Sequence, residues 1–283
     1  MAVPLRPFGP TGVQVPVLGQ GTWNMELDAR GSALHALMCG IDAGLTHIDT
    51  AEIYGNGRVE RLVGEAIAGR RDELFLVDKV LPENASRHGT IDACDRSLER
   101  LGTDRLDCYL LHWPGGHPIE ETIASFEELL QSGKILSWGV SNFDEDELAE
   151  AIAVAGPGRL ACNQIYYQLR QRGVEHAVIP FCEKHGIAVV AYSPFGAGHF
   201  PSLRSRAGRV LIEIAEAHGA SPHQVALAFL TRLPSVFAIP KAARAAHVFD
   251  NAAAGKFSLT DEERGRIEAA FPRGPRRLGV PSL

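Results

Sequence analysis

The chain has 283 residues, of which 45% are hydrophobic and 22% are charged, and its formal net charge is -6 at pH 7. This composition is typical of a globular protein with a large buried core, and it excludes the disordered, fibrous and membrane-embedded classes. Because the net charge is negative and Lys and Arg form no cluster, the sequence disfavours nucleic acid and membrane surfaces as partners. A small molecule is the expected partner.

Cysteine usage and the first residues bear on the cellular compartment. No C-x-x-C pair occurs, and an odd number of thiols fits reduced rather than disulfide-bonded cysteines. The start MAVPLRPFGPTG has no apolar core of signal-peptide length, and no apolar run approaches the roughly 18 residues of a membrane span. The sequence therefore predicts a cytoplasmic protein with reduced thiols at Cys39, Cys94, Cys108, Cys162 and Cys182.

Short apolar segments rich in β-branched residues alternate with amphipathic segments along the chain. The predicted helices include 31–43, 57–68, 119–132 and 175–185, each followed by a glycine that suits the end of a helix. The predicted strands are eight in number and lie at 17–21, 45–49, 74–79, 107–112, 135–140, 160–165, 187–192 and 236–240.

A recurring strand, helix and glycine predicts parallel strands joined by right-handed crossovers. Eight such units close most economically into a (β/α)8 TIM barrel, whose usual size is about 250 residues, and a doubly wound open sheet is the alternative. Residues 3–16 are a predicted β-hairpin around the Gly and Pro residues of 9–12, placed to close the bottom of the barrel. No linker divides the chain, so we expect one domain spanning residues 1–283.

The longest connection lies between the seventh and eighth predicted strands. It holds a loop rich in Gly, Pro and Ser at 194–206 and two helical segments at 208–218 and 221–231. Long irregular loops of this kind are often functional. The tail at 256–283 is short, which predicts an open substrate site.

Polar residues follow three consecutive predicted strands. In a (β/α)8 barrel the active residues lie at the carboxyl ends of the strands, and these positions hold Asp49 with the nearby Tyr54, then Lys79, then His112. Taken singly, each has a structural explanation as a cap, a packed aromatic, a surface charge or a satisfied buried histidine. Together they would be costly to bury unless they formed a functional network.

Carbonyl reduction gives that network a chemical purpose. Hydride addition to carbon leaves an oxyanion that needs a proton. Tyr54 can donate one, but its ordinary pKa of about 10 makes it a weak acid, so we expect Lys79 to lower that pKa. Asp49 would keep Lys79 charged, and His112 would donate to the same carbonyl oxygen.

Seven motifs occur in order along the chain: HIDTAEIYGN, DKV, LLHWP, GVSNF, NQIYY, AYSPFG and IPK. Together they resemble the signatures of the aldo-keto reductase superfamily over essentially the entire chain. The sequence is most similar to the bacterial branch with methylglyoxal reductases and diketogluconate reductases. The resemblance implies a barrel enzyme, commonly monomeric, that reduces aldehydes or ketones with a nicotinamide cofactor. It also implies a catalytic tetrad of Asp49, Tyr54, Lys79 and His112, with Tyr54 as general acid.

The same resemblance implies how the cofactor is held, since no complete G-x-G-x-x-G fingerprint is present. NADPH is the expected cofactor and NADH the alternative. The nicotinamide would stack on Tyr192, and the loop that begins at Ser193 would lie against the pyrophosphate. The implied cofactor-binding residues are Gly21, Thr22, Asp49, Ser141, Asn142, Gln164, Tyr192, Ser193, Pro194, Phe195, Gly196, Lys241, Ala242, Arg244, His247, Asp250 and Asn251.

The adenosine end departs from the family pattern. Ala242 and His247 stand where the family often has Ser and Arg. Lys241 remains as a point charge for a 2′-phosphate, Arg244 can add a fork, and His247 can stack on adenine. A solvated helix end is the alternative explanation for Asp250 and its neighbour Asn251.

Three further residues invite interpretation. Asp78 stands where the family usually has a hydroxyl residue. Because strand residues alternate, it should point outward and pair with a basic group of the helix layer. Trp23 and Trp113 follow the first and fourth strands, where they would shape a substrate pocket together with Tyr54 and His112. Core packing is the alternative for both tryptophans.

Other functional classes fit less well. No G-x-S-x-G elbow, H-E-x-x-H motif or Cys/His cluster with metal-ligand spacing occurs, so neither a serine hydrolase nor a metal site is expected. Two alternatives stay open: an NADPH-binding regulatory barrel with little turnover, and a sugar or alcohol dehydrogenase that works in the oxidative direction. Small aldehydes such as methylglyoxal are the hypothesised substrates.

Overall fold

The computed structural model describes residues 3–276 and 278–283, and Met1, Ala2 and Arg277 lie outside the described residues. Eight strands form one parallel sheet in the order β10-β9-β8-β7-β6-β5-β4-β3. Parallel bridges join Leu18 to Ala238 and Gly21 to Lys241, so the β3 edge meets the β10 edge and the sheet closes into a barrel. The predicted (β/α)8 barrel is confirmed, and the open-sheet alternative is wrong.

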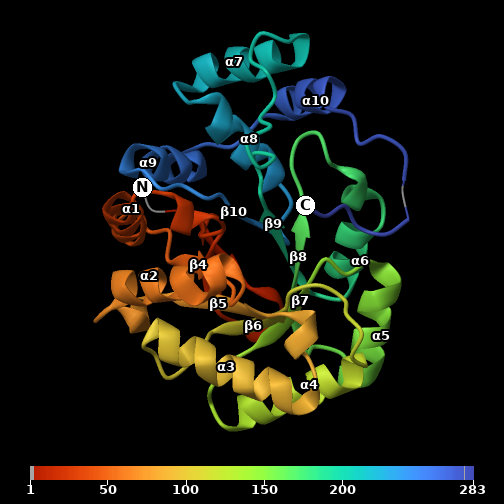
Figure 1. Cartoon of the computed structure of the whole chain (residues 1–283). Helices are drawn as coiled ribbons and strands as arrows, with labels where there is room; N and C mark the ends of the chain where they lie inside the picture. Colours follow the sequence, from red (N-terminus) through yellow and green to blue (C-terminus); the bar gives the residue numbers. More distant parts are fainter. Residues whose placement is uncertain (1–2, 277) are drawn as a thin grey trace.

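Helices surround the sheet in Figure 1. The strands of the barrel are β3 (Gln20–Gly21), β4 (His47–Asp49), β5 (Phe75–Val80), β6 (Cys108–Leu111), β7 (Trp138–Ser141), β8 (Leu160–Tyr166), β9 (Ala188–Tyr192) and β10 (Val236–Ile239). The helices are α1 (Arg30–Asp42), α2 (Arg58–Ile67), α3 (Arg87–Leu101), α4 (Ile119–Gln131), α5 (Glu145–Ala155), α6 (Val178–Lys184), α7 (Arg206–His218), α8 (Pro222–Leu230), α9 (Ala245–Ala253) and α10 (Asp261–Ala270).

The barrel strands are buried on both faces, which explains their continuous apolar runs. Every residue of β5, β6 and β8 is buried, because one face meets the barrel interior and the other meets the helices. The first predicted strand, 17–21, shrinks to Gln20–Gly21. There the backbone changes partners, since Val17 N–H donates to the Pro4 carbonyl at 2.9 Å and Gly19 N–H donates to the Ala238 carbonyl at 2.9 Å.

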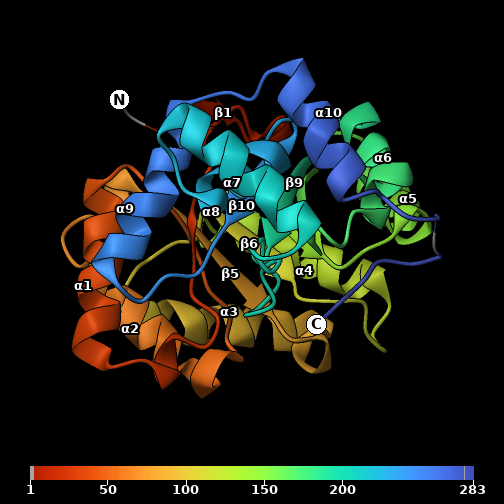
Figure 2. The same cartoon turned by 90° about the horizontal axis from the view of Figure 1, so that it is seen from above.

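The predicted hairpin is present as β1 (Leu5–Pro7) and β2 (Gln14–Pro16), and it closes one end of the barrel. Its turn places the Phe8 ring among barrel side chains, with ring centroids 4.6 Å from Phe75 and 5.2 Å from Phe237. Gly9 follows with a φ of 54°, and a Cβ there would lie 2.1 Å from the Ala161 carbonyl oxygen, so only glycine fits. In Figure 2 β1 lies at the opposite end of the barrel from the last residues of the chain.

His47 packs against the Phe8 ring and has no hydrogen-bond partner among the described residues. It is fully buried, neither ring nitrogen is hydrogen-bonded to the described residues, and its ring meets Phe8 edge-on at 5.8 Å and Phe75 at 5.6 Å. Burial, assisted by the charge of Lys79, lowers the pKa of His47 to about 3. The imidazole is therefore neutral in the folded protein and becomes protonated first in the unfolded chain.

We expect the variant His47→Leu to be more stable than the parent. Removing two unpartnered nitrogens should raise the free energy of unfolding at pH 7 by about 1–2 kcal/mol. Between the ordinary pKa of histidine and the lowered pKa of His47, only the unfolded chain takes up the proton. As the pH falls through this range, the free energy of unfolding of the parent should therefore decrease by roughly 1.4 kcal/mol per pH unit. Denaturant unfolding at several pH values checks this, with exposed His88→Leu as the control. An unchanged acid slope in His47→Leu would contradict it.

The long connection between β9 and β10 contains the two expected helices, α7 and α8. The tail carries one more helix, α10, which contacts α7. All five cysteines are free, and four of them are buried. None of the helices formed by the described residues is long and apolar enough to cross a membrane.

Candidate active site

Three neighbouring strands and the loop after β4 bring the predicted tetrad together at the open end of the barrel. Asp49 ends β4, Lys79 lies near the end of β5 and His112 follows β6, while Tyr54 opens the short 3-10 helix after β4. A cavity of about 520 Å³ lies at this end, and Asp49, Tyr54 and His112 line it. The sequence predicted this convergence correctly.

Asp49 and Lys79 form a buried ion pair beneath the cavity. Lys79 Nζ lies 2.5 Å from Asp49 Oδ1 and donates to the Thr50 carbonyl at 2.7 Å, and both charged side chains are at most 2% exposed. Burial raises the pKa of Asp49 despite the opposing charge of Lys79. Burial alone would lower the pKa of Lys79, but Asp49 reverses this and the net shift is upward, so the ammonium form is stabilised.

The Tyr54 hydroxyl reaches the same ammonium group. Lys79 Nζ lies 3.5 Å from Tyr54 Oη and 5.1 Å from the centre of the ring. Burial raises the pKa of Tyr54, and although Lys79 pulls it down, the charge of Asp49 adds to the rise. Lys79 thus lowers the pKa of Tyr54 as expected, but burial outweighs its attraction and the net shift is upward. At neutral pH Tyr54 therefore carries its proton.

His112 borders the cavity beside Tyr54. Their ring centroids lie 5.7 Å apart in an edge-to-face arrangement. Burial, with the charge of Lys79, lowers the pKa of His112 well below its ordinary value, so the imidazole is neutral. Its Nδ1 has no partner among the described residues. A neutral ring is a hydrogen-bond donor through one nitrogen only.

The residues expected at the nicotinamide form a connected polar wall. Asn142 Nδ2 donates to the His112 carbonyl and to Ser141 Oγ, both at 3.1 Å, and Asn142 Oδ1 accepts from the Tyr192 hydroxyl at 2.9 Å. The Tyr192 ring is stacked on Tyr166 with centroids 5.6 Å apart. Asn142 adopts a φ of 62°, which asparagine tolerates better than most residues.

Gln164 lines the cavity, but its amide nitrogen is already hydrogen-bonded to Asp49. Gln164 Nε2 donates to Asp49 Oδ2 at 2.6 Å. Thr22 Oγ1 likewise donates to the Asp49 carbonyl at 2.8 Å, and Gly21 packs where a Cβ would lie 2.6 Å from the Ile239 carbonyl oxygen. Gln164 thus orients the carboxylate that holds Lys79, a role that the sequence did not suggest.

The loop after β9 reaches the cavity only at its start. Ser193 lines the cavity with a φ of 46°, and Pro194 and Gly196 are buried. Phe195 turns outward from the cavity and packs edge-on against His223 at 4.9 Å.

The expected adenosine end lies on the loop after β10. Lys241 lines the cavity and is paired with Asp28 of the loop after β3. Arg244 contacts His247, with nitrogen atoms 2.8 Å apart, and both side chains are exposed. Three neighbours are less accessible: Ala242 is 8% exposed, Asn251 is 4% exposed, and both oxygens of Asp250 accept hydrogen bonds from the start of α8.

The cavity wall contains residues that the sequence did not single out. Trp23 and Trp113 line it as expected, which excludes core packing as their only role. The tail also reaches the cavity, where its last residues form part of the wall. The expectation of an open site is therefore wrong, because the tail lies across part of the mouth. The additional lining residues are Ile53, Pro114, Ile239, Val280, Ser282 and Leu283.

Asp78 behaves differently from the expectation. It is fully buried and faces the helix layer as predicted, and its Oδ1 accepts from the Lys79 backbone N–H at 2.8 Å. Its side-chain neighbour is Glu60 of α2 rather than a basic group, since Arg100 pairs with Glu60 at 2.5 Å. Burial and the Glu60 charge raise the pKa of Asp78 well above its ordinary value. The second carboxyl oxygen of Asp78, Oδ2, has no hydrogen-bond partner among the described residues.

No group of three or more His, Cys, Asp or Glu side chains within residues 3–276 and 278–283 is arranged to hold a metal ion.

Comparison with known proteins agrees with this geometry. The sequence model of the Aldo/keto reductase family matches residues 17–271. The chain is 45% identical over 263 residues to methylglyoxal reductase YeaE of Escherichia coli (strain K12), covering 92% of each protein. It is 34% identical over 282 residues to methylglyoxal reductase DkgB of Yersinia pestis, covering 96% of this chain and 98% of that protein.

Comparison with solved structures also identifies aldo/keto reductases. An aldo/keto reductase of Klebsiella pneumoniae, solved in complex with NADP and acetate, is 40% identical and matches with a TM-score of 0.92 over 100% of both chains. The resemblance to methylglyoxal reductases seen in the motifs is confirmed by the relatives. This chain belongs to the aldo/keto reductase family.

Proposed function

We propose that the protein reduces small aldehydes and 2-oxoaldehydes, such as methylglyoxal, to alcohols with NADPH. The observation that carries the proposal is the Lys79 ammonium, held by Asp49 at 2.5 Å and lying 3.5 Å from the Tyr54 hydroxyl at the base of a cavity. Such an arrangement suits protonation of an oxygen that becomes negative during reaction.

The four residues have distinct proposed roles. Tyr54, protonated at neutral pH, donates its proton to the carbonyl oxygen of the substrate. Lys79 stabilises the phenolate that remains, and Asp49 holds Lys79 in its charged form. His112 is neutral and donates a hydrogen bond that orients the carbonyl group. A bound nicotinamide would supply the hydride.

The described residues suit a nicotinamide dinucleotide. Asn142 and Ser141 present polar groups at the cavity, and the Tyr192 ring borders the same space. Lys241 lies at the far side as a cation for a 2′-phosphate, which favours NADPH over NADH. The Klebsiella pneumoniae relative was solved with NADP, which supports this choice.

The cofactor preference is tested by steady-state kinetics with both nucleotides. We expect kcat/KM for NADPH to exceed that for NADH by about tenfold or more, since a single charge contact is worth about 1.4 kcal/mol or above. Lys241→Met should reduce the ratio toward one, whereas Lys256→Met, a lysine outside the cavity, should not. Comparable kcat/KM values for the two nucleotides with the parent protein would contradict the preference.

The size and lining of the cavity support a small carbonyl substrate. Its volume is about 520 Å³, and Trp23 and Trp113 contribute apolar walls. Two relatives are methylglyoxal reductases. The direct experiment is to follow NADPH oxidation by the purified protein with a panel of aldehydes, ketoses and 2-oxo compounds. We expect the highest kcat/KM with small 2-oxoaldehydes.

The same experiment separates the two alternatives. Tight NADPH binding with negligible turnover across the panel would favour a regulatory barrel. Faster NADP reduction with sugars or alcohols than NADPH oxidation with their carbonyl forms would favour a dehydrogenase. A cytoplasmic location, a monomeric state and a single domain stay predictions of the sequence.

A further inference from the structure

The last part of the chain takes a long path to reach the cavity. After α10 it runs past the loop that follows β8, and its last residues lie over the centre of the barrel, as Figure 1 shows. There Val280, Ser282 and Leu283 form part of the cavity wall. We call residues 278–283 the closing segment. Leu278 is fully exposed, so the segment touches the barrel mainly at its far end.

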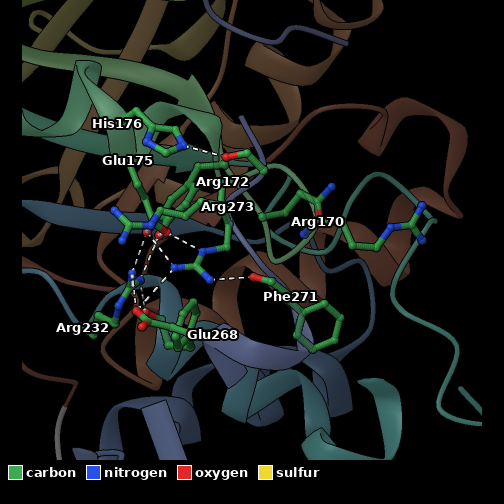
Figure 3. A network of polar contacts seen from close by, with 12 residues as sticks. Arg170, Arg172, Glu175, His176, Arg232, Glu268, Phe271 and Arg273 are labelled. Atoms are coloured by element: carbon green, nitrogen blue, oxygen red, sulfur yellow. Dashed lines mark hydrogen bonds and ion pairs between the residues drawn. The ribbon is translucent and has the colours of Figure 1, made fainter. Parts of the chain in front are cut away.

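A network of charges lies where this path begins. Figure 3 shows Arg172, Glu175, Arg232, Glu268 and Arg273, which we call the anchor cluster. Arg172 Nε and Nη2 each donate to Glu175 at 2.7 Å, and Arg232 Nη2 donates to it at 3.0 Å. Arg273 lies 3.8 Å from Glu175, and Glu268 lies 3.5 Å from Arg172. One carboxylate, that of Glu175, thus holds three guanidinium groups.

The centre of the cluster is buried, whereas Glu268 and Arg273 at its edge are about half exposed. The side chain of Arg172 is 1% exposed and that of Glu175 is 5% exposed. Tyr167 donates to Glu175 at 2.5 Å, and the guanidinium groups of Arg172 and Arg232 lie 4.8 Å and 4.0 Å from the Phe229 ring centre. Burial opposes the charge of Glu175, but Arg172 and Tyr167 outweigh it and lower its pKa. Removing one member of such a cluster leaves the others poorly compensated.

Backbone contacts connect the cluster to the chain that leaves α10. Arg172 Nη1 donates to the Phe271 carbonyl at 2.6 Å, and His176 Nε2 lies 2.9 Å from the Gly274 carbonyl oxygen. Further along, Arg276 pairs with Glu145 at 2.5 Å. These contacts fix the chain at three successive points just before the closing segment.

We infer that the anchor cluster positions the closing segment against the cavity, and that Glu175 is a positioning residue for substrate binding. The inference rests on the proposed function, since it takes the cavity as the site of the carbonyl substrate. Loosening the cluster frees the closing segment to leave the mouth. Substrate binding then weakens, while the tetrad, which lies at the ends of β4, β5 and β6 and in the 3-10 helix after β4, keeps its geometry.

The test compares Glu175→Gln with the double variant His176→Ala/Arg273→Ala. The double variant removes only exposed or half-exposed side chains, so it stays informative if Glu175→Gln fails to fold. We expect KM for methylglyoxal at saturating NADPH to rise about fivefold in either variant, with kcat nearly unchanged. Hydrogen exchange of the backbone amides in residues 278–283 should become faster in parallel.

The matched control is Arg266→Ala. Arg266 lies on α10, is 40% exposed, and pairs with Glu213 of α7 outside the anchor cluster. It should change neither KM nor the exchange of the closing segment.

Two outcomes would overturn the inference. One is an unchanged exchange rate in residues 278–283 of the folded variants, and the other is faster exchange there with an unchanged KM. Failure of the proposed function is distinguishable, because it would appear as absence of turnover in the parent protein, and the exchange measurement does not need turnover.

Discussion

Tyr54→Phe should lower kcat for carbonyl reduction by roughly a hundredfold to ten-thousandfold, the range that one general acid contributes. The substitution deletes the hydroxyl that lies 3.5 Å from Lys79 Nζ and keeps the ring that contacts His112 edge-on. Affinity for NADPH should change little, because the hydroxyl is not proposed to hold the cofactor. Single-turnover kinetics and cofactor titration check both parts.

Tyr109→Phe is the matched control for that experiment. Tyr109 is fully buried on β6, its hydroxyl has no partner among the described residues, and its ring packs against Phe126 in the helix layer. The same chemical change there should leave kcat intact. Near-normal turnover in Tyr54→Phe would refute its role as proton donor.

Lys79→Met should reduce kcat by about a hundredfold to a thousandfold, comparable to the loss of one preorganised electrostatic donor. Without the ammonium, nothing offsets burial and Asp49, so the pKa of Tyr54 rises further above its ordinary value. A general acid loses activity when it deprotonates, so the alkaline decline of the rate should move to higher pH. A pH–rate profile at saturating NADPH measures both effects.

The control for Lys79→Met concerns folding. The substitution leaves the buried Asp49 carboxylate without its cation and with only the hydrogen bond from Gln164 at 2.6 Å. An unpaired buried charge lowers the free energy of unfolding by about 3–5 kcal/mol. The double variant Asp49→Asn/Lys79→Met removes that charge and should recover stability without recovering activity. Wild-type rate and pH profile in Lys79→Met would contradict the proposed network.

The sequence predicted the barrel because its signals are local and repeated. Continuous apolar strands such as 187–192 and amphipathic helices such as 119–132 keep their period, and their ends shift by only a few residues in β9 and α4. The strand at 17–21 was overestimated, because its residues divide their backbone hydrogen bonds among the hairpin, β10 and β4. That division depends on tertiary contacts and leaves no local pattern.

The tetrad was predictable for a topological reason. Parallel strands end at the same rim, so Asp49, Lys79 and His112 had to meet once β4, β5 and β6 were identified. The sign of the Tyr54 pKa shift was not predictable, since it depends on how far burial outweighs one cation. The tail was also missed, because Val280 and its neighbours carry no motif and are placed by contacts made many residues earlier in the chain.

The aromatic plug formed by Phe8, Phe75 and Phe237 affects the order in which cofactor and substrate bind and leave. Because this plug fills one end of the barrel, the dinucleotide and the carbonyl compound both enter through the cavity at the other end. The molecule seated deeper has to arrive first and depart last. Reaction order, and inhibition by a substrate that enters prematurely, are thereby linked to Phe8, a turn residue at the opposite end of the barrel.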